Sequence, residues 1–383
     1  MLASVRAMSG NGDVKVRAAV SRGVGMATSV EELVLAAPGA GEVRVAIDAC
    51  AVCHSDLMFL DGGWATDFPV VLGHEAAGHV VELGEGVDNV AVGDRVVVSL
   101  IRACGECRAC RRGHDVACNG DLALRHRSPL SDLNGDPVAH GLGTAAFAEQ
   151  IVVHRSQVAA FPDGVPSVAA ALLGCGVLTG VGAVTNTAQV GEGESVVVIG
   201  CGGVGLSVVQ GARLAGADPI VAVDPLVSKQ ESALKFGATH ATGPDDTADR
   251  LTGATGGRLA DHVFVTTAAP GAFAGATGLL DRMGSLVLVG IPAEGVTFDI
   301  DPGVLAVANQ RILGSKMGTA RLAEDVPRLV DQYLSGQLDL DGMVTSTYSL
   351  DEIDTAFAEA RSGEAIRTVV VFDHSGHTGN STR

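Results

Sequence analysis

The sequence predicts an α/β protein in which a doubly wound parallel sheet is inserted into a second, β-rich domain. Three observations predict this class. A strand, a glycine turn, a helix and a second strand follow one another over 196–224, strands and helices continue to alternate up to residue 315, and short strand patterns lie on both sides of that segment. A chain of 383 residues has room for about two domains.

The segment 196–224 has the pattern of a dinucleotide site. Residues 196–199 are β-branched and apolar, as in a strand that is buried on both faces. A G-x-G-x-x-G turn follows, then a helix through Leu214 and a strand over 220–223. The glycines let a pyrophosphate approach the backbone, and the helix N-terminus supplies free N–H groups and a positive dipole. The predicted contacts in the turn are Gly200, Gly202, Gly203, Val204 and Gly205.

The second strand ends at Asp224, nineteen residues after Gly205, where the fingerprint places an acid that binds the ribose 2′-OH. This acid favours NAD as the cofactor. A 2′-phosphate would meet a like charge there, and no arginine directly follows.

The other elements are predicted in order. Ahead of the glycine turn we expect strands over 14–20, 31–35 and 42–47, a strand, turn and strand over 80–98, a long surface loop over 119–140, a strand over 147–153, and helices over 168–173 and 179–188. After it we expect a helix over 229–236, strands over 262–265, 286–290 and 311–315, and a helix over 272–280. Helices over 326–334 and 350–360 and a strand over 367–372 return to the first domain.

Composition and charge exclude several classes of protein. Hydrophobic residues make up 47% of the chain and charged residues 18%, as in an ordinary globular protein. A formal net charge of −18 argues against nucleic acid or an anionic membrane as a partner. The sequence has no apolar run long enough to span a bilayer, and its first twelve residues lack the apolar centre of a signal peptide. We therefore expect a cytoplasmic protein without a membrane segment.

Four of the eight cysteines lie within fifteen positions: Cys104, Cys107, Cys110 and Cys118. In a reducing compartment such a cluster is more typical of a metal site than of disulfides. Four thiolates form a closed tetrahedral site, which predicts a structural zinc. An iron–sulfur cluster and a pair of disulfides are the alternatives.

Cys53, His74 and Cys175 are the candidates for a second zinc. Two thiolates and one imidazole leave a fourth position open, as a catalytic zinc requires. Taken singly, each could be an ordinary buried cysteine or a hydrogen-bonded histidine, and only the combination favours a metal.

Together these motifs resemble the zinc-dependent alcohol dehydrogenases of the medium-chain dehydrogenase/reductase superfamily. The resemblance spans residues 14–372 and includes the closing segment 362–368. It implies a GroES-like catalytic domain over 14–176 and 319–373, with the structural-zinc lobe near 100–120, and a Rossmann NAD-binding domain over 177–318. Residues 1–13 and 374–383 would be mobile tails. It also implies an active site between the two domains and a homodimer or homotetramer joined through the last sheet strands.

The resemblance also implies roles for single residues. Cys53, His74 and Cys175 would bind the catalytic zinc. Ser55 would take the alcohol proton, and Asp56 would orient the zinc-bound imidazole.

Further roles follow in the same way. Glu75 would lie behind the zinc, His54 and Arg367 would bind the pyrophosphate, Lys229 would lie near the adenosine ribose, and Thr179 would abut the nicotinamide. Ser55 could instead cap a helix, Lys229 could be a solvated lysine, and Arg367 could pair with an acid.

The sequence departs from the family at two places. Many relatives carry a histidine five residues after the first zinc cysteine, where it passes the proton to water, but Met58 stands there in this chain. Glutathione-dependent formaldehyde dehydrogenases place an acid on the loop that carries Trp64 here. Trp64 and Leu100 are the expected walls of the substrate pocket, although Trp64 could also be a core aromatic.

The predicted function is hydride transfer between a primary or secondary alcohol and NAD, with two zinc ions per chain; the reverse reaction reduces an aldehyde or ketone. Within this class, a nicotinoprotein that keeps its cofactor and a thiol-adduct formaldehyde dehydrogenase are alternatives. A polyol or amino-alcohol dehydrogenase is another. Outside it, the alternative is a catalytically silent protein that senses dinucleotides.

Overall fold

The computed structural model of the chain describes residues 12–373, and the predicted mobile tails therefore lie outside the described residues apart from 12 and 13. The chain divides into two compact units. Unit 1 comprises the residues up to Cys175, the segment 322–334 and the residues from Leu340 onward, and unit 2 comprises Gly176–Arg321 and Ser335–Asp339.

The predicted first domain included Gly176 and the segments 319–321 and 335–339, whereas in the structure these residues belong to unit 2. The side chain of Gln210 donates to the carbonyl of Asp339 at 3.1 Å and accepts from its N–H at 2.8 Å. Arg213 also donates to the carbonyl of Gln337. Helix α4, which carries both side chains, therefore holds the segment 335–339 within unit 2.

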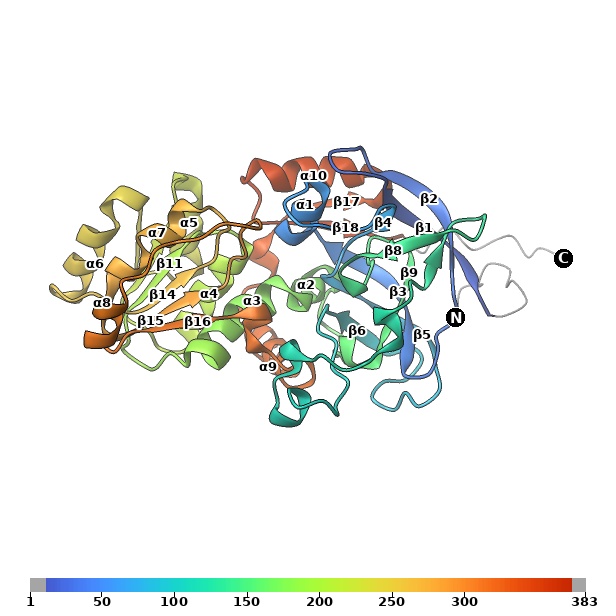
Figure 1. Cartoon of the computed structure of the whole chain (residues 1–383), viewed down its shortest axis with the longest axis horizontal. Coiled ribbons are helices and arrows are strands. Elements are labelled where there is room, and N and C mark those ends of the chain that lie inside the picture. The colour runs from blue at the N-terminus through green and yellow to red at the C-terminus, as the bar shows by residue number, and fades with distance from the viewer. Residues whose placement is uncertain (1–11, 374–383) are drawn as a thin grey trace. The chain divides into compact units, whose positions relative to one another are not determined.

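Unit 2 is built on a parallel sheet, which confirms the predicted doubly wound fold (Figure 1). Its strands lie in the order β13 (His240–Thr242), β12 (Ile220–Val223), β11 (Val196–Ile199), β14 (Ala260–Val265), β15 (Leu280–Leu288) and β16 (Arg311–Gly314). The main helices are α3 (Gly176–Gly182), α4 (Gly203–Leu214), α5 (Val227–Phe236), α6 (Thr247–Thr255) and α8 (Pro302–Val307). The first strand and the helix after the glycine turn have the predicted bounds.

The helix predicted over 272–280 is wrong in its length. The structure has helix α7 (Gly271–Ala274) and a 3-10 turn over Ala276–Leu279, and strand β15 begins at Leu280. Gly275 separates the two pieces, since glycine is the least favourable residue in a helix interior apart from proline. Strand β13 and helix α6 were not predicted.

Unit 1 is rich in β-structure, as predicted. Its larger sheet has the order β10 (Val158–Ala160), β6 (Arg95–Val98), β5 (Ala76–Leu83), β3 (Glu42–Ala51), β18 (Arg367–Val371) and β17 (Val344–Ser349), with β9 (Gln150–His154) also paired to β3. A closed barrel contains β1 (Val14–Ser21), β2 (Ser29–Leu35), β7 (Leu130–Ser131), β8 (Pro137–His140) and β4 (Val70–Val71). The helices are α1 (His54–Leu60), α2 (Ser167–Ala171), α9 (Leu322–Leu334) and α10 (Ile353–Ser362).

The prediction of an irregular loop over 119–140 is wrong in its second half. Strands β7 and β8 form a hairpin there, and the carboxylate of Asp132 accepts from the N–H groups of Asn134 at 2.8 Å and Asp136 at 2.9 Å in the turn. Strands of two and four residues are too short to show an alternating pattern, which is why the sequence missed them.

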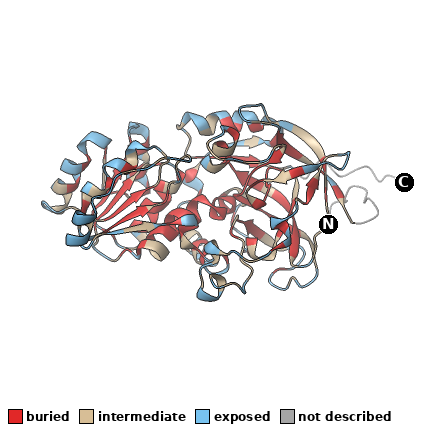
Figure 2. Cartoon of the chain, in the orientation of Figure 1, coloured by how far each residue is buried: buried red, intermediate tan, exposed pale blue. Residues whose placement is uncertain are grey.

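Each unit has its own apolar core, to which most of the strands contribute buried residues (Figure 2). In unit 1, Phe147 is fully buried and meets Phe357 of helix α10 edge to face, with ring centroids 5.5 Å apart. In unit 2, the core includes Val197 of β11 and Leu251 of α6. The two cores hold the strand ends and turns that carry the predicted site residues.

No single helix within residues 12–373 is long and apolar enough to cross a membrane, whereas one bent pair, Ser167–Gly174 with Gly176–Ala188, would pass by length and composition alone.

A histidine at the end of β8, whose ring nitrogens are buried, makes the stability of unit 1 sensitive to acid. Both ring nitrogens of His140 are buried without a hydrogen bond to a described residue. Burial, reinforced by the charges of Arg102 and Arg127, lowers the pKa of His140 to about 3. The unfolded chain, with an imidazole pKa of about 6.5, binds this proton first. The contribution of His140 to stability is therefore lost as pH falls from about 6.5 towards 3.

We expect His140→Met to flatten the acid limb of the unfolding free energy. The difference in slope should approach one proton, about 1.4 kcal/mol per pH unit between pH 6 and 4. Denaturant unfolding at a series of pH values measures it, with His126→Gln as the control, since the His126 side chain is 69% exposed. Equal slopes for the wild type and His140→Met would contradict the assignment.

Candidate active site and structural metal centre

The first zinc-ligand candidate lies where strand β3 gives way to helix α1. Cys53 is the N-cap of this helix, and its backbone is extended, with φ −109° and ψ 150°. Asp56, three positions later, is fully buried and accepts a hydrogen bond from the Cys53 N–H at 3.1 Å. This contact satisfies a free donor of the first turn and fixes the backbone that carries the Cys53 thiol.

The same carboxylate fixes the histidine. Asp56 accepts from the Gly73 N–H at 3.0 Å and lies 3.2 Å from Nδ1 of His74. Gly73 has φ +92°, and a side chain there would collide with the backbone of Phe147. Only glycine suits this turn, and Asp56 thereby sets the orientation of the imidazole.

Cys53, His74 and Cys175 converge in unit 1. Their ligand atoms all lie within 4.8 Å of one another, and all three residues are buried. Asp56 is the partner of Nδ1, so the other ring nitrogen of His74, Nε2, faces the thiols. Nε2 is buried and makes no hydrogen bond. A buried ring nitrogen without a partner, beside two thiols, fits a zinc ion with three protein ligands.

The three groups also shift one another's pKa values. The hydrogen bond between the two thiols lowers the pKa of Cys53 and raises that of Cys175. Burial lowers the pKa of His74, but Asp56 and Cys53 raise it by more. A cation would replace the protons on these groups, as expected of a metal site.

Glu75 and Arg367 form a buried ion pair next to this set. Nη2 of Arg367, on strand β18, contacts Oε2 of Glu75, and the two side chains are 7% and 0% exposed. Burial lowers the pKa of Arg367, but Glu75, Cys53 and Cys175 raise it by more. The guanidinium therefore pairs with the carboxylate beside the zinc ligands. This confirms the alternative that Arg367 pairs with an acid, although the sequence did not indicate that the acid is Glu75.

The remaining candidates of unit 1 lie on or near helix α1. His54 is exposed and Ser55 is half-buried in the first turn, directly after Cys53. Trp64 is half-buried and its ring meets that of Phe59 edge to face, with centroids 5.3 Å apart. The backbone N–H of Trp64 donates to the carbonyl of Met58 at 3.1 Å.

Leu100, the second expected wall of the substrate pocket, is half-buried two residues after the end of strand β6. It comes from a different part of unit 1 from helix α1, so the two expected walls are held by separate elements.

The glycine turn of unit 2 has the geometry that the sequence requires. Gly200 has φ +96°, and Gly202 is the N-cap of helix α4, which begins at Gly203 and Val204. A side chain on Gly205 would lie 1.8 Å from the Gly200 carbonyl oxygen, whereas one on Gly202 would meet nothing within 4 Å. The turn is therefore closely packed at Gly205 and open at Gly202, which suits a pyrophosphate at the helix N-terminus.

Asp224 is buried and already accepts two backbone hydrogen bonds, from Cys201 at 2.8 Å and Leu226 at 2.9 Å. These contacts tie the end of β12 to the glycine turn, a role that the sequence did not predict. Lys229 is also buried, and burial lowers its pKa against the opposing charge of Asp224.

Thr179, on α3, places its hydroxyl 3.7 Å from Sδ of Met317. The sequence reasoning missed Met317. Its left-handed φ of +50° could not be read from the chain, and the glycine that follows it is the one weak signal.

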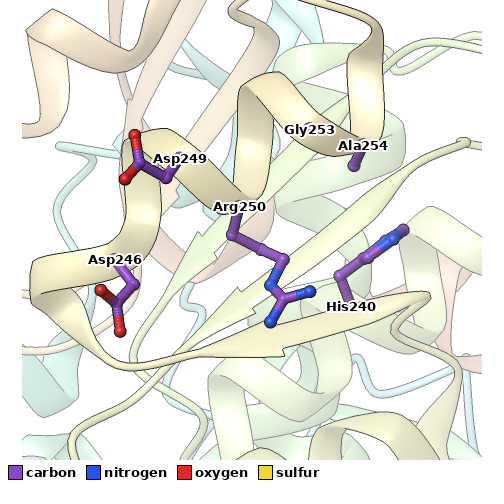
Figure 3. Close-up of a pocket in the computed structure, with 6 residues that line it drawn as sticks. All are labelled: His240, Asp246, Asp249, Arg250, Gly253 and Ala254. Atoms are coloured by element: carbon purple, nitrogen blue, oxygen red, sulfur yellow. The ribbon is translucent and has the colours of Figure 1, made fainter.

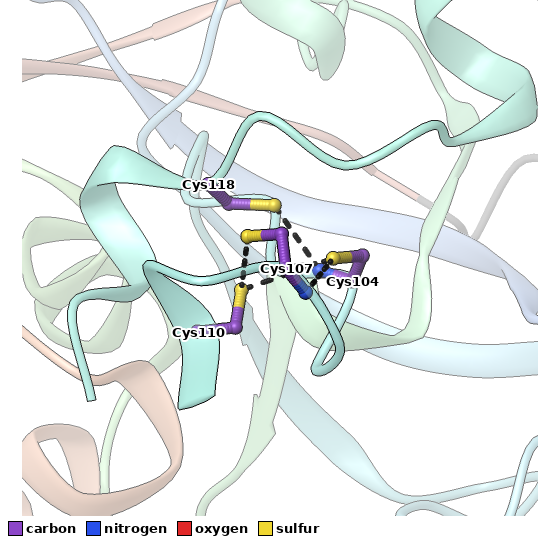
Figure 4. Close-up of side chains that lie close together, drawn as sticks. All are labelled: Cys104, Cys107, Cys110 and Cys118. Carbon is purple, nitrogen blue, oxygen red and sulfur yellow. Dashed lines mark hydrogen bonds between the residues drawn. The ribbon is translucent and has the colours of Figure 1, made fainter. Parts of the chain in front are cut away.

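The four clustered cysteines form a separate site in unit 1 (Figure 4). Their sulfurs lie within 4.8 Å of one another, with 4.0 Å between Cys104 and Cys110 and 3.5 Å between Cys107 and Cys110. Zinc–sulfur bonds of about 2.3 Å in a tetrahedron require sulfurs about 3.8 Å apart, whereas a disulfide requires about 2.05 Å. None of the eight cysteines forms a disulfide, so the disulfide alternative does not hold and the cluster fits a structural zinc.

Backbone N–H groups prepare the cluster for thiolates. The N–H of Cys104 donates to the sulfur of Cys118 at 3.3 Å, and the N–H of Cys107 donates to the sulfur of Cys104 at 3.3 Å. Backbone hydrogen bonds lower the pKa of Cys107 to about 6. Donors held in place before the metal binds favour the deprotonated sulfurs that zinc requires.

One hollow on unit 2 lies away from the predicted site residues of that unit. A surface hollow of about 530 Å³ lies over helix α6 of unit 2 (Figure 3). None of the predicted site residues lines it; its walls are His240, Asp246, Asp249, Arg250, Gly253 and Ala254.

A parallel dinucleotide-type sheet, a β-rich unit with a buried donor set of two thiols and one imidazole, and a four-cysteine lobe together define a zinc-containing dehydrogenase. Residues 39–163 match the model of the alcohol dehydrogenase GroES-like domain, and residues 203–335 match that of the zinc-binding dehydrogenase domain. The chain belongs to the zinc-dependent alcohol dehydrogenases of the medium-chain dehydrogenase/reductase superfamily.

Named relatives align along nearly their whole length. An NDMA-dependent alcohol dehydrogenase of Amycolatopsis methanolica is 35% identical, over 94% of this chain and 99% of its own. An S-(hydroxymethyl)glutathione dehydrogenase of Paracoccus denitrificans is 36% identical, over 94% and 100%. The crystal structure of benzyl alcohol dehydrogenase from Acinetobacter calcoaceticus aligns with a TM-score of 0.87 at 30% identity, over 94% and 99%.

Solved structures of similar fold include complexes with either dinucleotide. A zinc-binding dehydrogenase of Sinorhizobium meliloti, with a TM-score of 0.78 and 26% identity over 94% and 99% of the chains, is bound to NADP. Acetophenone reductase of Geotrichum candidum, with a TM-score of 0.75 and 25% identity over 94% and 97%, is in complex with NAD.

Proposed function

We propose that this protein oxidises a primary or secondary alcohol with NAD as the hydride acceptor, and reduces the aldehyde or ketone in reverse. The convergence of Cys53, His74 and Cys175, with Nε2 of His74 left without a hydrogen bond, is the observation that carries the proposal. Such a set fits a zinc ion with one open position, which a substrate oxygen can take.

Zinc bound by these residues would supply Lewis acidity that lowers the pKa of the substrate hydroxyl. The chain supplies the rest. Ser55, in the first turn after Cys53, would take the alcohol proton, and Asp56 would keep Nε2 of His74 directed at the metal. Glu75, held by Arg367, would place a negative charge behind the metal.

The choice of cofactor rests on Asp224. Its buried carboxylate would repel the 2′-phosphate of NADP, and the next residues, Pro225 and Leu226, offer no positive charge to offset it. His54 and Arg367 of unit 1 and Thr179 and Lys229 of unit 2 would add contacts to the dinucleotide, as the family resemblance implies.

The test is the absorbance of reduced nicotinamide, followed with NAD and with NADP over a panel of aliphatic, allylic and aromatic alcohols. Adding S-(hydroxymethyl)glutathione to the panel tests the thiol-adduct alternative. We expect NADH formation with NAD and at least about tenfold less with NADP, as a like charge at the ribose implies. A chain that binds one zinc and shows no turnover would instead be the silent dinucleotide sensor.

A cofactor that never leaves the protein is the second candidate, because one relative is named as NDMA-dependent. In that case added NAD yields no free NADH, whereas alcohol is consumed when an external acceptor such as NDMA is supplied. The two outcomes exclude each other.

We also propose a homodimer or homotetramer in the cytoplasm. Strand β16 pairs on one side only, with β15, and exposed apolar side chains occur on β15 and α8 of unit 2: Met283, Val304 and Val307. An unpaired strand edge with apolar neighbours suits pairing with a second copy. The absence of disulfides among the eight cysteines suits a reducing compartment. Light scattering tests the first proposal.

Met58 stands where relatives carry a histidine that releases the proton. We expect Met58→His to change the pH dependence of alcohol oxidation by adding a limb near the ordinary imidazole pKa of about 6.5. The gain in turnover above that pH should stay below the roughly hundredfold that direct general-base catalysis contributes. Met58→Gln, polar but not titratable, is the control. An unchanged profile would mean that proton release never limits the reaction.

A further inference from the structure

The zinc lobe carries positive charge in an otherwise acidic protein. The segment 102–127 holds six arginines and three acidic residues, whereas the whole chain has a formal net charge of −18. Three of these arginines have partners. Arg102 donates to the carbonyl of Leu124 at 3.1 Å, Arg125 donates to the carbonyl of Cys118 at 2.9 Å, and Arg127 pairs with Glu42 at 2.5 Å.

The other three arginines have no such role. The side chains of Arg108, Arg111 and Arg112 make no hydrogen bond or ion pair with any described residue, and neither does that of His114. All four residues are exposed. The 3-10 turn Cys110–Arg112 brings them together: the N–H groups of Arg112 and His114 both donate to the carbonyl of Ala109, each at 3.0 Å.

A hollow of about 320 Å³ lies among these side chains. It is lined by Arg108, Ala109, Arg112, His114, Ala117 and Asn119, and it includes no acidic residue. Two guanidinium groups, an imidazole and a carboxamide offer donors on its walls, and two alanines leave room between them. Its volume falls at the lower end of the range of small-molecule sites.

The negative charge of the zinc-lobe thiolates does not explain why Arg108 and Arg112 lie on this hollow. Arg102, which is half-buried, is the arginine of this segment whose charge interacts with the Cys118 thiol. Backbone N–H groups also donate to the sulfurs of Cys104 and Cys118. Neither Arg108 nor Arg112 makes a side-chain hydrogen bond to a thiol of the described residues. Unpaired like charges close together repel each other unless an anion lies between them.

We propose that this hollow binds the phosphate group of a small anionic ligand, through the guanidinium groups of Arg108 and Arg112 and the imidazole of His114. Planar guanidinium groups bind phosphate oxygens in pairs, a geometry that a lysine ammonium cannot provide. The lining of the hollow includes none of the residues Cys53, His74 and Cys175, and the glycine turn belongs to unit 2. The proposal is independent of the proposed alcohol oxidation.

The test is calorimetric titration of the zinc-loaded full chain with inorganic phosphate at constant ionic strength, in the presence of excess NAD so that the glycine turn does not bind the probe. We expect saturable binding in the millimolar range or tighter. The double variant Arg108→Gln/Arg112→Gln should weaken it at least about tenfold, and Arg108→Lys/Arg112→Lys should restore only part of it.

The matched control is Arg258→Gln/Arg282→Gln, which removes the same charge from two exposed arginines of unit 2. It should change the dissociation constant less than about twofold. The proposal is overturned if the wild type shows no saturable binding, or if the control weakens binding as much as the lobe variant. The zinc content of every variant shows whether the lobe is still folded. If the glutamine variant loses zinc as well as phosphate binding, the lysine variant provides the test instead.

Discussion

Replacing His74 by alanine, or Cys175 by serine, is expected to lower turnover of alcohol by about a thousandfold or more while dinucleotide binding survives. The loss follows from the metal: zinc stabilises developing negative charge by several kcal/mol, and about 4 kcal/mol corresponds to a thousandfold in rate. Binding should survive because the glycine turn, Asp224 and Lys229 belong to unit 2, whereas all three zinc ligands belong to unit 1.

Three measurements separate this result from a general loss of structure. Metal analysis should give one zinc per chain in the variants and two in the wild type, turnover should fall, and the dissociation constant for NAD should change less than about threefold. Cys50→Ser is the matched control, since Cys50 is a buried cysteine of the same unit that belongs to neither metal set. A variant that lacks the second zinc and still turns over at the wild-type rate would contradict the assignment.

The features that the sequence predicted well depend on short stretches of chain. Strand β11, the glycine turn and strand β12 could be placed to the residue. A run of β-branched residues indicates a strand, and the spacing of three glycines and an acid indicates the turn and the end of the next strand. The four-cysteine lobe was equally predictable, because its cysteines lie within fifteen positions of the sequence. Joining Cys53, His74 and Cys175 required the family resemblance, because 101 residues separate His74 from Cys175.

The features that the sequence missed depend on contacts between distant or very short segments. The hairpin over 130–140 has strands too short to carry a pattern. The segment 335–339 belongs to unit 2 through hydrogen bonds to Gln210 and Arg213, more than a hundred positions earlier. An acid as the partner of Arg367 was one of the alternatives, but the pairing with Glu75 spans 292 positions, and no local rule identifies the partner at that distance.

This last pair leads to the second large effect. Replacing Arg367 by methionine is expected to destabilise unit 1 by about 3–5 kcal/mol, because the carboxylate of Glu75 would stay buried without its cation. The Glu75 side chain is fully buried, so water cannot take the place of the guanidinium. Methionine keeps most of the aliphatic volume, and the cost is therefore mainly electrostatic.

Denaturant unfolding followed by the fluorescence of Trp64 measures this effect, since Trp64 is the one tryptophan of the chain and lies in unit 1. Arg361→Met is the matched control. Arg361 pairs with Asp61 at 2.7 Å in the same unit, but the two side chains are 41% and 50% exposed, and such a pair contributes about 0–1 kcal/mol. Equal losses for the two variants would contradict the buried-charge explanation.

The double variant Glu75→Gln/Arg367→Met distinguishes two roles for the guanidinium. If Arg367 serves only to neutralise Glu75, removing both charges should recover most of the lost stability and leave the affinity for NAD close to that of the wild type. If Arg367 also contacts the pyrophosphate, as the family resemblance implies, stability should recover while NAD binding stays weakened by about tenfold or more. The affinity of the double variant for NAD therefore shows whether Arg367 binds the cofactor in addition to neutralising Glu75 beside the zinc ligands.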